Sequence, residues 1–348
     1  DALLWVWPSF PVVQVAALLV NILLPALILL VVTKINTIEW IERYVWLIIA
    51  AGMVNIVSRL FDLPTLMLVE NASRGLFAMW VSAMAWMLLL HRWRNLSWLA
   101  RIMLVFLLAG NIYYYFYTSR LWLSGWLPMM AAIFVISWLR SPKLGLLLAV
   151  AGLVFVAVNI TDLYESIVVD NQREGGLQRL ELWRMNLEHV VNHPVFGLGP
   201  AGYAPYNMTY HPRDARSTHN NYFDILAQTG IVGFGIFIRL IVSLVKVAWQ
   251  AIQLHKDQPG SMQRAFSHMA AGGLAATVIA MMLGDWVLPF AYNQSITGFD
   301  NAAITWISLG LLVRLSLPDM AVGHAAGAAA DGVLEPAHDV AAEARQLR

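Results

Sequence analysis

Residues 216–233 read Arg216-Ser217-Thr218-His219-Asn220-Asn221-Tyr222-Phe223-Asp224-Ile225-Leu226-Ala227-Gln228-Thr229-Gly230-Ile231-Val232-Gly233. This stretch passes from hydrogen-bonding side chains to an apolar run that continues far enough to cross a membrane. The polar part therefore lies at the start of a helix, where free backbone N–H groups favour anions. We expect the imidazole of His219 to lie where water meets lipid.

The composition of the whole chain is that of a membrane protein. Of its 348 residues, 59% are hydrophobic and only 12% are charged, and no soluble domain needs so apolar a sequence. A net charge of +1 gives no bulk electrostatic preference for nucleic acid. The absence of cysteine excludes disulfides and thiolate metal sites.

Long apolar runs recur along the chain, and most have the length that a membrane-spanning helix requires. We therefore expect an all-α, polytopic membrane helix bundle of about nine spans. The runs cover residues 10–33, 44–60, 76–90, 98–117, 121–139, 144–160, 222–249, 268–288 and 302–317.

Basic residues fall in alternate short loops, which the positive-inside rule assigns to the cytoplasm. These residues are Lys34, Arg43, Arg92, Arg94, Arg140, Lys143, Lys256 and Arg264. We expect four regions: transmembrane helices over 1–160, a structured periplasmic loop over 161–221, further transmembrane helices over 222–317, and a cytoplasmic tail over 318–348. The tail is rich in alanine and glycine and lacks the apolar content for a core.

Two features indicate that the periplasmic loop has structure. Apolar residues at helical spacing predict an amphipathic helix over 177–191 that packs on the membrane surface or on the bundle; they are Leu180, Trp183, Leu187, Val190 and Val191. Pro194 should end this helix. The glycines at 197, 199 and 202 then match the spacing of a dinucleotide-binding loop, but no strand precedes them. We interpret them as a tight turn that lets the backbone approach a neighbour closely.

His219-Asn220, followed by Gly230 and Gly233 at this spacing, resembles the signature of the bacterial O-antigen ligases. The wider superfamily includes O-antigen polymerases and protein O-oligosaccharyltransferases. The resemblance extends to residues 179–183 and 193–199, and to the pair Ser119-Arg120 at the start of a span. Such ligases have about twelve spans with both ends inside, so the resemblance implies about three further spans before Asp1.

Arginines in the periplasmic loop and at outer helix ends oppose the usual charge bias. They are Arg74, Arg120, Arg173, Arg179, Arg184, Arg213 and Arg216. A bound phosphate would offset the free-energy cost of placing an arginine there, because the planar guanidinium can bond two phosphate oxygens at once. Arg184 instead has glutamates three residues before it and four after it, which predicts a solvated ion pair. Arg74 fits lipid head-group anchoring, and Arg213 an exposed position.

The ligase resemblance implies a glycosyltransferase at the bacterial inner membrane, active on the periplasmic side in lipopolysaccharide biosynthesis. The donor would be a glycan on undecaprenyl diphosphate, and the acceptor a sugar hydroxyl of lipid A–core. Membrane lipids are further partners, and no nucleic acid is expected. An O-antigen or exopolysaccharide polymerase and a protein O-oligosaccharyltransferase are the alternatives. A lipid-linked-glycan transporter is a third, but it would place polar groups near the membrane midplane.

We assign His219 as the general base, because an imidazole ordinarily titrates near neutral pH. The sequence leaves open a second role, in which His219 binds diphosphate as a cation. The diphosphate-binding residues are Arg120, Arg173, Arg179 and Arg216, and the supporting residues are Ser119, Asn220, Gly230 and Gly233. Any one of five acidic residues near outer helix ends could orient the imidazole: Asp62, Glu70, Asp224, Asp285 and Asp300. No cofactor or metal is expected, although His189 and His193 have the spacing of two metal ligands on a helix.

Overall fold

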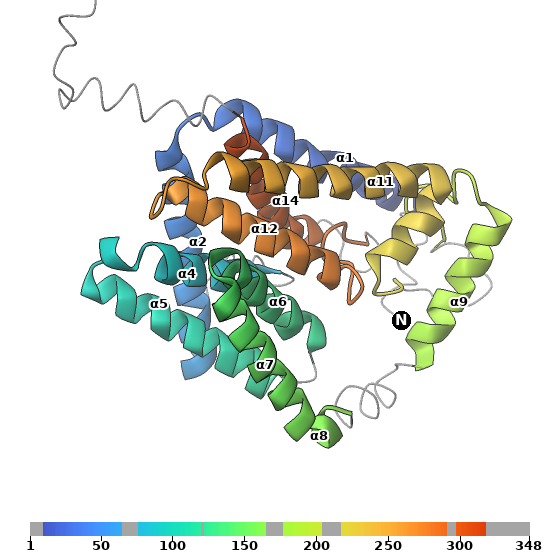
Figure 1. The fold of residues 1–348 in the computed structure, drawn as a ribbon. Helices are drawn as coiled ribbons and strands as arrows, with labels where there is room; N and C mark the ends of the chain where they lie inside the picture. The colour runs from blue at the N-terminus through green and yellow to red at the C-terminus, as the bar shows by residue number, and fades with distance from the viewer. Residues whose placement is uncertain are drawn as a thin grey trace, which may run out of the picture.

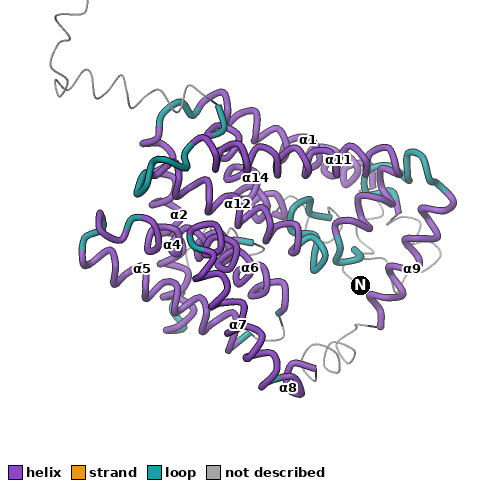
Figure 2. The backbone as a smooth tube through the Cα atoms, in the orientation of Figure 1, coloured by secondary structure: helices purple, strands orange, loops and turns teal. Residues whose placement is uncertain are grey.

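The computed structural model describes residues 10–64, 76–119, 122–164, 177–203, 217–290 and 297–317. Within these ranges the chain is helical and contains no strand (Figures 1 and 2). The α-helices are α1 (Phe10–Lys34), α2 (Ile38–Phe61), α4 (Phe77–His91), α5 (Trp98–Asn111), α6 (Leu123–Arg140), α7 (Pro142–Val158), α8 (Ile160–Tyr164), α9 (Leu177–Asn192), α11 (Asn221–Leu254), α12 (Met262–Ala280) and α14 (Thr297–Leu315). A 3₁₀ turn η2 (Trp93–Asn95) precedes α5, and a π-helix η3 (Ile112–Thr118) extends it.

The all-α class predicted from the sequence is confirmed for the described residues, and each predicted apolar run overlaps a helix. Among the helices of the described residues, five are long and apolar enough to cross a membrane: α1, α2, α5 with η3, α6 and α11. The helices α4 and α7 are apolar but shorter. The count of nine spans and the four-region division remain predictions.

The helix α4 lies at the centre of the bundle. Its sequence is apolar on every side, and the side chains from Phe77 to Ala85 are all buried, as expected for a helix surrounded by other helices. It packs against α2, α5, α6 and α12. The helix α7 is equally apolar, yet only Gly145 is buried along it, so its surface suits contact with lipid.

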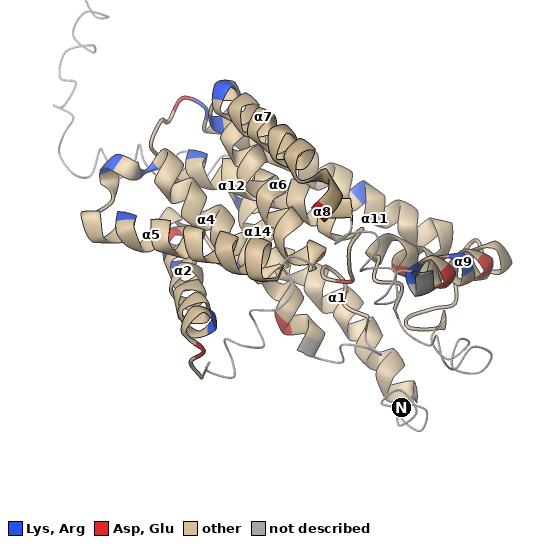
Figure 3. Ribbon diagram, turned by 90° about the horizontal axis from the view of Figure 1, so that it is seen from below, with Lys and Arg blue, Asp and Glu red and all other residues tan. Residues whose placement is uncertain are grey.

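Bundle helices that follow one another along the chain alternate in direction, so the bundle has two distinct ends (Figure 1). We call one the His219 end; there α2, α7 and α12 finish and α11 begins. We call the other the Lys34 end; there α1 and α6 finish and α5, α7 and α12 begin. Figure 3 shows lysines and arginines gathered where α5 and α7 begin, which agrees with the predicted alternation of basic loops.

Two predicted helices differ from the structure at the His219 end. The run 268–288 was expected to be helical throughout, but α12 finishes at Ala280 and residues 281–290 form an irregular loop. Gly284, Asp285 and Pro289 disfavour helix in that loop. The run 222–249 was expected to be continuous, but Gly230 has φ 63° and ψ −169° and interrupts α11.

Candidate active site

The interruption of α11 is filled by the loop that follows α9. At Gly230 the helix loses its regular hydrogen-bonding pattern, and residues 194–199 supply backbone partners on both sides of the break. Four backbone bonds join the two segments: Ile231 N to Pro194 O (2.8 Å), Val232 N to Val195 O (3.3 Å), Leu198 N to Ala227 O (2.9 Å), and Gly199 N to Gln228 O (2.9 Å). The first turns of α11 are therefore held as a separate short segment beside α9, as Figure 1 shows.

Glycine is required on both sides of this contact. A Cβ on Gly230 would meet the carbonyl oxygen of Val195, and a Cβ on Gly197 would meet the backbone at Ala227 and Gln228. The predicted close approach of the 197–202 turn is thus confirmed. Gly230, a glycine of the signature, lies on the other side of the same contact, and its neighbour is the loop that follows α9. Gly233 differs, because a Cβ there would meet only the side chain of Thr229.

His219 lies in the last residues before α11, in a conformation that L-amino acids rarely adopt. Its φ is 51°, in the left-handed region. The next residue, Asn220, caps the helix, since its side-chain oxygen accepts hydrogen bonds from Tyr222 N (3.0 Å) and Phe223 N (3.5 Å). Asn220 therefore fixes the start of α11 directly after His219, and its supporting role in the reaction stays a prediction.

The carboxylate nearest in sequence, Asp224, bonds the loop in front of His219 and not the imidazole. Its Oδ1 accepts hydrogen bonds from the hydroxyls of Thr218 (2.6 Å) and Tyr203 (2.5 Å). Burial, together with the charge of Asp224, raises the pKa of Tyr203 well above its usual value, so the phenol keeps its proton and donates. Asp224 thus anchors the residue before His219.

Asp285 is the carboxylate that lies beside His219. Its Oδ1 is 3.8 Å from His219 Nδ1, and the Asp285 side chain is 2% exposed, whereas that of His219 is 39% exposed. The other oxygen of Asp285 accepts a hydrogen bond from Phe290 N (3.2 Å). The structure thus brings a buried carboxylate near one ring nitrogen of an accessible imidazole, at a distance longer than a hydrogen bond.

Asn221 fixes the loop that carries Asp285. Its backbone N–H donates to Met281 O (2.9 Å), its side-chain amide donates to Leu288 O (2.7 Å), and its side-chain oxygen accepts from Val287 N (3.1 Å). One asparagine at the start of α11 thus secures the irregular segment after α12. The sequence showed Asp285 only as one of five acidic residues, since nothing along the chain pairs residues 219 and 285.

The helix predicted over 177–191 is confirmed as α9, and Trp183 joins it to the His219 turn. The indole N–H donates to Thr218 O (2.9 Å), and the ring stacks on Phe223 at 5.3 Å. The prediction of which face of this helix packs was wrong in part, because Leu180, Leu187 and Val191 are exposed. The buried face is Leu182, Met185, Asn186 and His189, since the helix is rotated to bring Trp183 and His189 toward the loop.

Two arginines of α9 have different surroundings. Arg179 lies one turn before Trp183 and is half-buried, and burial lowers its pKa; it stays charged at neutral pH nonetheless. The predicted surface pair of Arg184 is confirmed, with Nε 3.6 Å from Glu188 Oε1 and both side chains exposed. Arg120, Arg173 and Arg216 lie outside the described residues, as do Arg74, Arg213 and Glu70.

The segment around Ser119 reaches the same end of the bundle. Ser119 ends the π-helix and donates its backbone N–H to Tyr114 O (2.8 Å). Trp122, just after the Ser-Arg pair, contacts Trp286 with ring centroids 6.2 Å apart. Because Trp286 follows Asp285, the chain next to position 120 approaches the loop beside His219.

Arg59 is a further cation at the His219 end that the sequence interpretation did not single out. It lies in the last turn of α2, where Nη1 donates to Tyr114 Oη (3.0 Å) and Nε donates to Asn55 Oδ1 (3.1 Å). Like the arginines of the periplasmic loop, Arg59 opposes the charge bias of the positive-inside rule. The Arg59 guanidinium also lies 5.1 Å from the centre of the Tyr114 ring.

His189 and His193, which have the spacing of two metal ligands on a helix, lie in different surroundings. His189 is buried and stacks on Tyr203 at 6.4 Å, whereas His193 is exposed. Within the described ranges no group of three His, Cys, Asp or Glu side chains is placed to hold a metal ion.

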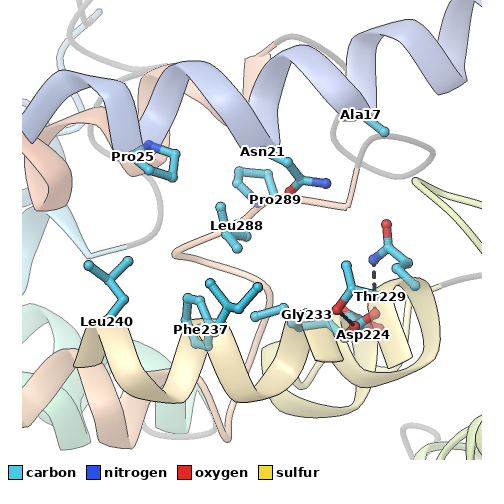
Figure 4. Close-up of a pocket in the computed structure, with 13 residues that line it drawn as sticks. Ala17, Asn21, Pro25, Asp224, Thr229, Gly233, Phe237, Leu240, Leu288 and Pro289 are labelled. Atoms are coloured by element: carbon cyan, nitrogen blue, oxygen red, sulfur yellow. Dashed lines mark hydrogen bonds between the residues drawn. The ribbon is translucent and has the colours of Figure 1, made fainter. Parts of the chain in front are cut away.

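A cavity of about 290 Å³ lies between α1 and α11, directly beside Asp224 (Figure 4). Its lining is polar toward the start of α11, where Asn21, Asp224, Gln228 and Thr229 gather, and apolar along the rest: Pro25, Ile225, Ile236, Phe237, Leu240, Leu288 and Pro289. Asp224 Oδ2 is buried and has no hydrogen-bond partner among the described residues. Such a cavity suits a ligand with an apolar part and a hydrogen-bond donor.

Comparison with protein families identifies this part of the chain. The family model described as O-antigen ligase matches residues 121–238. The matched segment is similar to the O-antigen ligase family. Members of that family are membrane enzymes that transfer lipid-linked glycans. The matched segment contains α9, the Gly230 break and His219, whereas Asp285 lies beyond it. A search of curated proteins found no match.

Proposed function

We propose that the chain is an O-antigen ligase-like glycosyltransferase that moves a glycan from undecaprenyl diphosphate to a sugar hydroxyl of lipid A–core. The observation that carries the proposal is the pair His219 and Asp285, an accessible imidazole backed by a buried carboxylate at 3.8 Å. It lies at the start of a helix inside the segment that matches the O-antigen ligase family. The basic residues at the Lys34 end support a periplasmic position for this site.

In this mechanism the acceptor hydroxyl attacks the anomeric carbon of the donor sugar. The bond from that carbon to the diphosphate oxygen breaks, and the diphosphate departs with the electron pair. His219 takes the proton of the hydroxyl, and the charge of Asp285 stabilises the imidazolium that forms. The diphosphate is already a good leaving group, so we expect no requirement for a divalent metal.

Arginines would stabilise the negative charge that grows on the leaving diphosphate. Arg179 is placed for this role by its half-buried position one turn from Trp183, which contacts the His219 turn. We assign Arg120, Arg173 and Arg216 to the same group. The assignment of Arg120 is supported by Trp122, which contacts Trp286 next to Asp285 and lies two residues after Arg120.

Two features favour an enzyme of lipid-linked substrates over a transporter. The polar groups gather at one end of the bundle, whereas a transporter would place them near the midplane. The cavity between α1 and α11 adds a site with both polar and apolar walls next to the His219 turn. A substrate that joins a hydrocarbon chain to a polar head would use both.

The test is a transfer assay with purified protein, lipid-linked glycan and lipid A–core. A ligase adds one glycan chain per acceptor; a ladder of growing chains without lipid A–core would show a polymerase, and transfer to serine or threonine of a peptide a protein O-oligosaccharyltransferase. His219→Ala should lower the rate of transfer about 10²- to 10⁴-fold while donor binding persists. Loss of donor binding instead would give His219 the charge-holding role.

A further inference from the structure

A cluster of basic side chains lies at the Lys34 end, far from the site described above. His91 ends α4, Arg140 ends α6, and Arg264 and His268 lie in the first turns of α12. The two imidazole rings are 4.9 Å apart, and both guanidinium groups lie within electrostatic range of them. The three helices that carry these residues pack on one another.

The cluster has unmet hydrogen-bonding capacity. His91 Nε2, His268 Nδ1 and Arg264 Nε are buried and have no partner among the described residues. No carboxylate within the described ranges forms an ion pair with Arg140 or Arg264. Arg140 is exposed and Arg264 is half-buried, so the group is open to solvent or lipid on one side. Two guanidinium groups without a counter-ion, beside two imidazoles whose buried ring nitrogens lack partners among the described residues, indicate a site for an anion.

An apolar groove leads from this cluster along the outside of α12. It has a volume of about 410 Å³ and lies between α6, α11 and α12. Its lining comprises Val135, Leu139, Val245, Ala248, Trp249, Ile252, Ala271, Leu274, Ala275 and Val278. On α6 the groove ends at Leu139, and the next residue is Arg140.

The groove and the cluster belong to one face of α12. Arg264, His268, Ala271, Ala275 and Val278 follow one another at intervals of four and three residues, which places them in one stripe along the helix. From Arg264 to Val278 the stripe extends about 21 Å at 1.5 Å per residue. One leaflet of a bilayer contributes about 15 Å of hydrocarbon. The stripe therefore passes from head-group depth to the middle of the bilayer.

We propose that this stripe binds one anionic glycerophospholipid of the leaflet at the Lys34 end. The phosphate would lie against Arg140 and Arg264, and an acyl chain would lie in the groove beside Ala271 and Ala275. Small side chains there leave room for the chain, and Trp249 flanks it. Charge complementarity selects a lipid with a net negative head group. The proposal is independent of the transferase reaction at His219.

The test uses the full chain, stripped of lipid in non-ionic detergent and titrated with phosphatidylglycerol, phosphatidylcholine or inorganic phosphate. Bound molecules are counted by native mass spectrometry. We expect phosphatidylglycerol to bind more tightly than phosphatidylcholine, and Arg140→Gln to lower its affinity about five-fold, since a basic residue near the membrane surface contributes about that factor. Arg140→Gln/Arg264→Gln should lower it about twenty-five-fold. The matched control Arg43→Gln/Lys256→Gln removes two charges at the same end and should change it less than two-fold.

Ala275→Leu separates a lipid from a free anion. It narrows the groove without changing charge, so it should weaken phosphatidylglycerol and leave inorganic phosphate unaffected. Equal binding of both lipids, or an unchanged affinity in the exposed variant Arg140→Gln, would overturn the proposal. So would inorganic phosphate that binds as tightly as phosphatidylglycerol. His219→Ala should bind phosphatidylglycerol normally, so failure here is distinguishable from failure of the transferase proposal.

Discussion

The two ends of the bundle are built in different ways. At the Lys34 end the connections are short, and ordinary caps close them: Ser97 caps α5 and Ser261 caps α12 through their side-chain oxygens. At the His219 end regular structure gives way to a broken helix at Gly230, a left-handed residue at His219 and an irregular loop over 281–290. Side-chain hydrogen bonds from Asn221 and Asp224 then fix those irregular segments.

The difference shows where this fold places its chemistry. A regular helix end satisfies its own backbone and presents few side chains in fixed positions. An irregular end needs side chains to satisfy the backbone, and the same bonds hold Asp285 and His219 in place. Four predictions test this contrast, beginning with the change that should disrupt it most.

Gly230→Ala should disrupt the fold of the His219 end. Gly230 occupies a region of φ and ψ that is almost exclusive to glycine, and a Cβ would push into the backbone at Val195. We expect a loss of about 3 kcal/mol or more of unfolding free energy, measured by thermal unfolding in detergent. Gly235→Ala is the matched control, because open space surrounds that position. Equal stability of the two variants would contradict the role of the break.

Asp285→Asn should lower kcat about ten- to hundred-fold without raising KM for the donor. The amide keeps the shape of the side chain but cannot stabilise an imidazolium. Steady-state kinetics of the transfer reaction measure the effect. The double variant His219→Ala/Asp285→Asn should be no slower than His219→Ala, since the carboxylate acts through the imidazole. Asp300→Asn, at an exposed carboxylate, is the control, and additive losses in the double variant would refute the pairing.

Arg179→Gln should raise KM for the lipid-linked donor about ten-fold, because one charge-assisted contact to phosphate is lost. Arg184→Gln, on the same helix but exposed and paired with Glu188, should change it less than two-fold. Donor titration of the transfer rate compares the two. A similar KM in both variants would leave Arg179 a structural residue.

Trp183→Phe should have the smallest effect. It keeps an aromatic ring that can stack on Phe223, and it removes the indole N–H that bonds Thr218 O together with part of the stacking area. We expect a loss of about 1 kcal/mol in unfolding free energy and a several-fold lower kcat, because the turn before His219 loses one restraint. Trp138→Phe, at an exposed indole of α6, is the control. A wild-type rate for Trp183→Phe would show that α9 does not hold the turn.

Much of this architecture follows from local sequence. Apolar runs predicted the helix positions, the charge pattern separated the two ends, and the glycines at 197 and 199 predicted a close backbone approach. The failures have a common cause. The break at Gly230 is completed by the loop 194–199, and the segment after Ala280 is held by Asn221 at the start of α11. Hydrophobic periodicity carries no information about either contact.

The sequence by itself determined the helical class, the apolar runs, and the polar turn with His219 at the start of α11. Only the tertiary structure decided which of five acidic residues faces the imidazole. Asp285 is 66 positions from His219, and the two meet because Asn221 ties the 281–290 loop to the start of α11. Sequence patterns report how one helix repeats, whereas a site assembled from separate helix ends depends on how those helices pack.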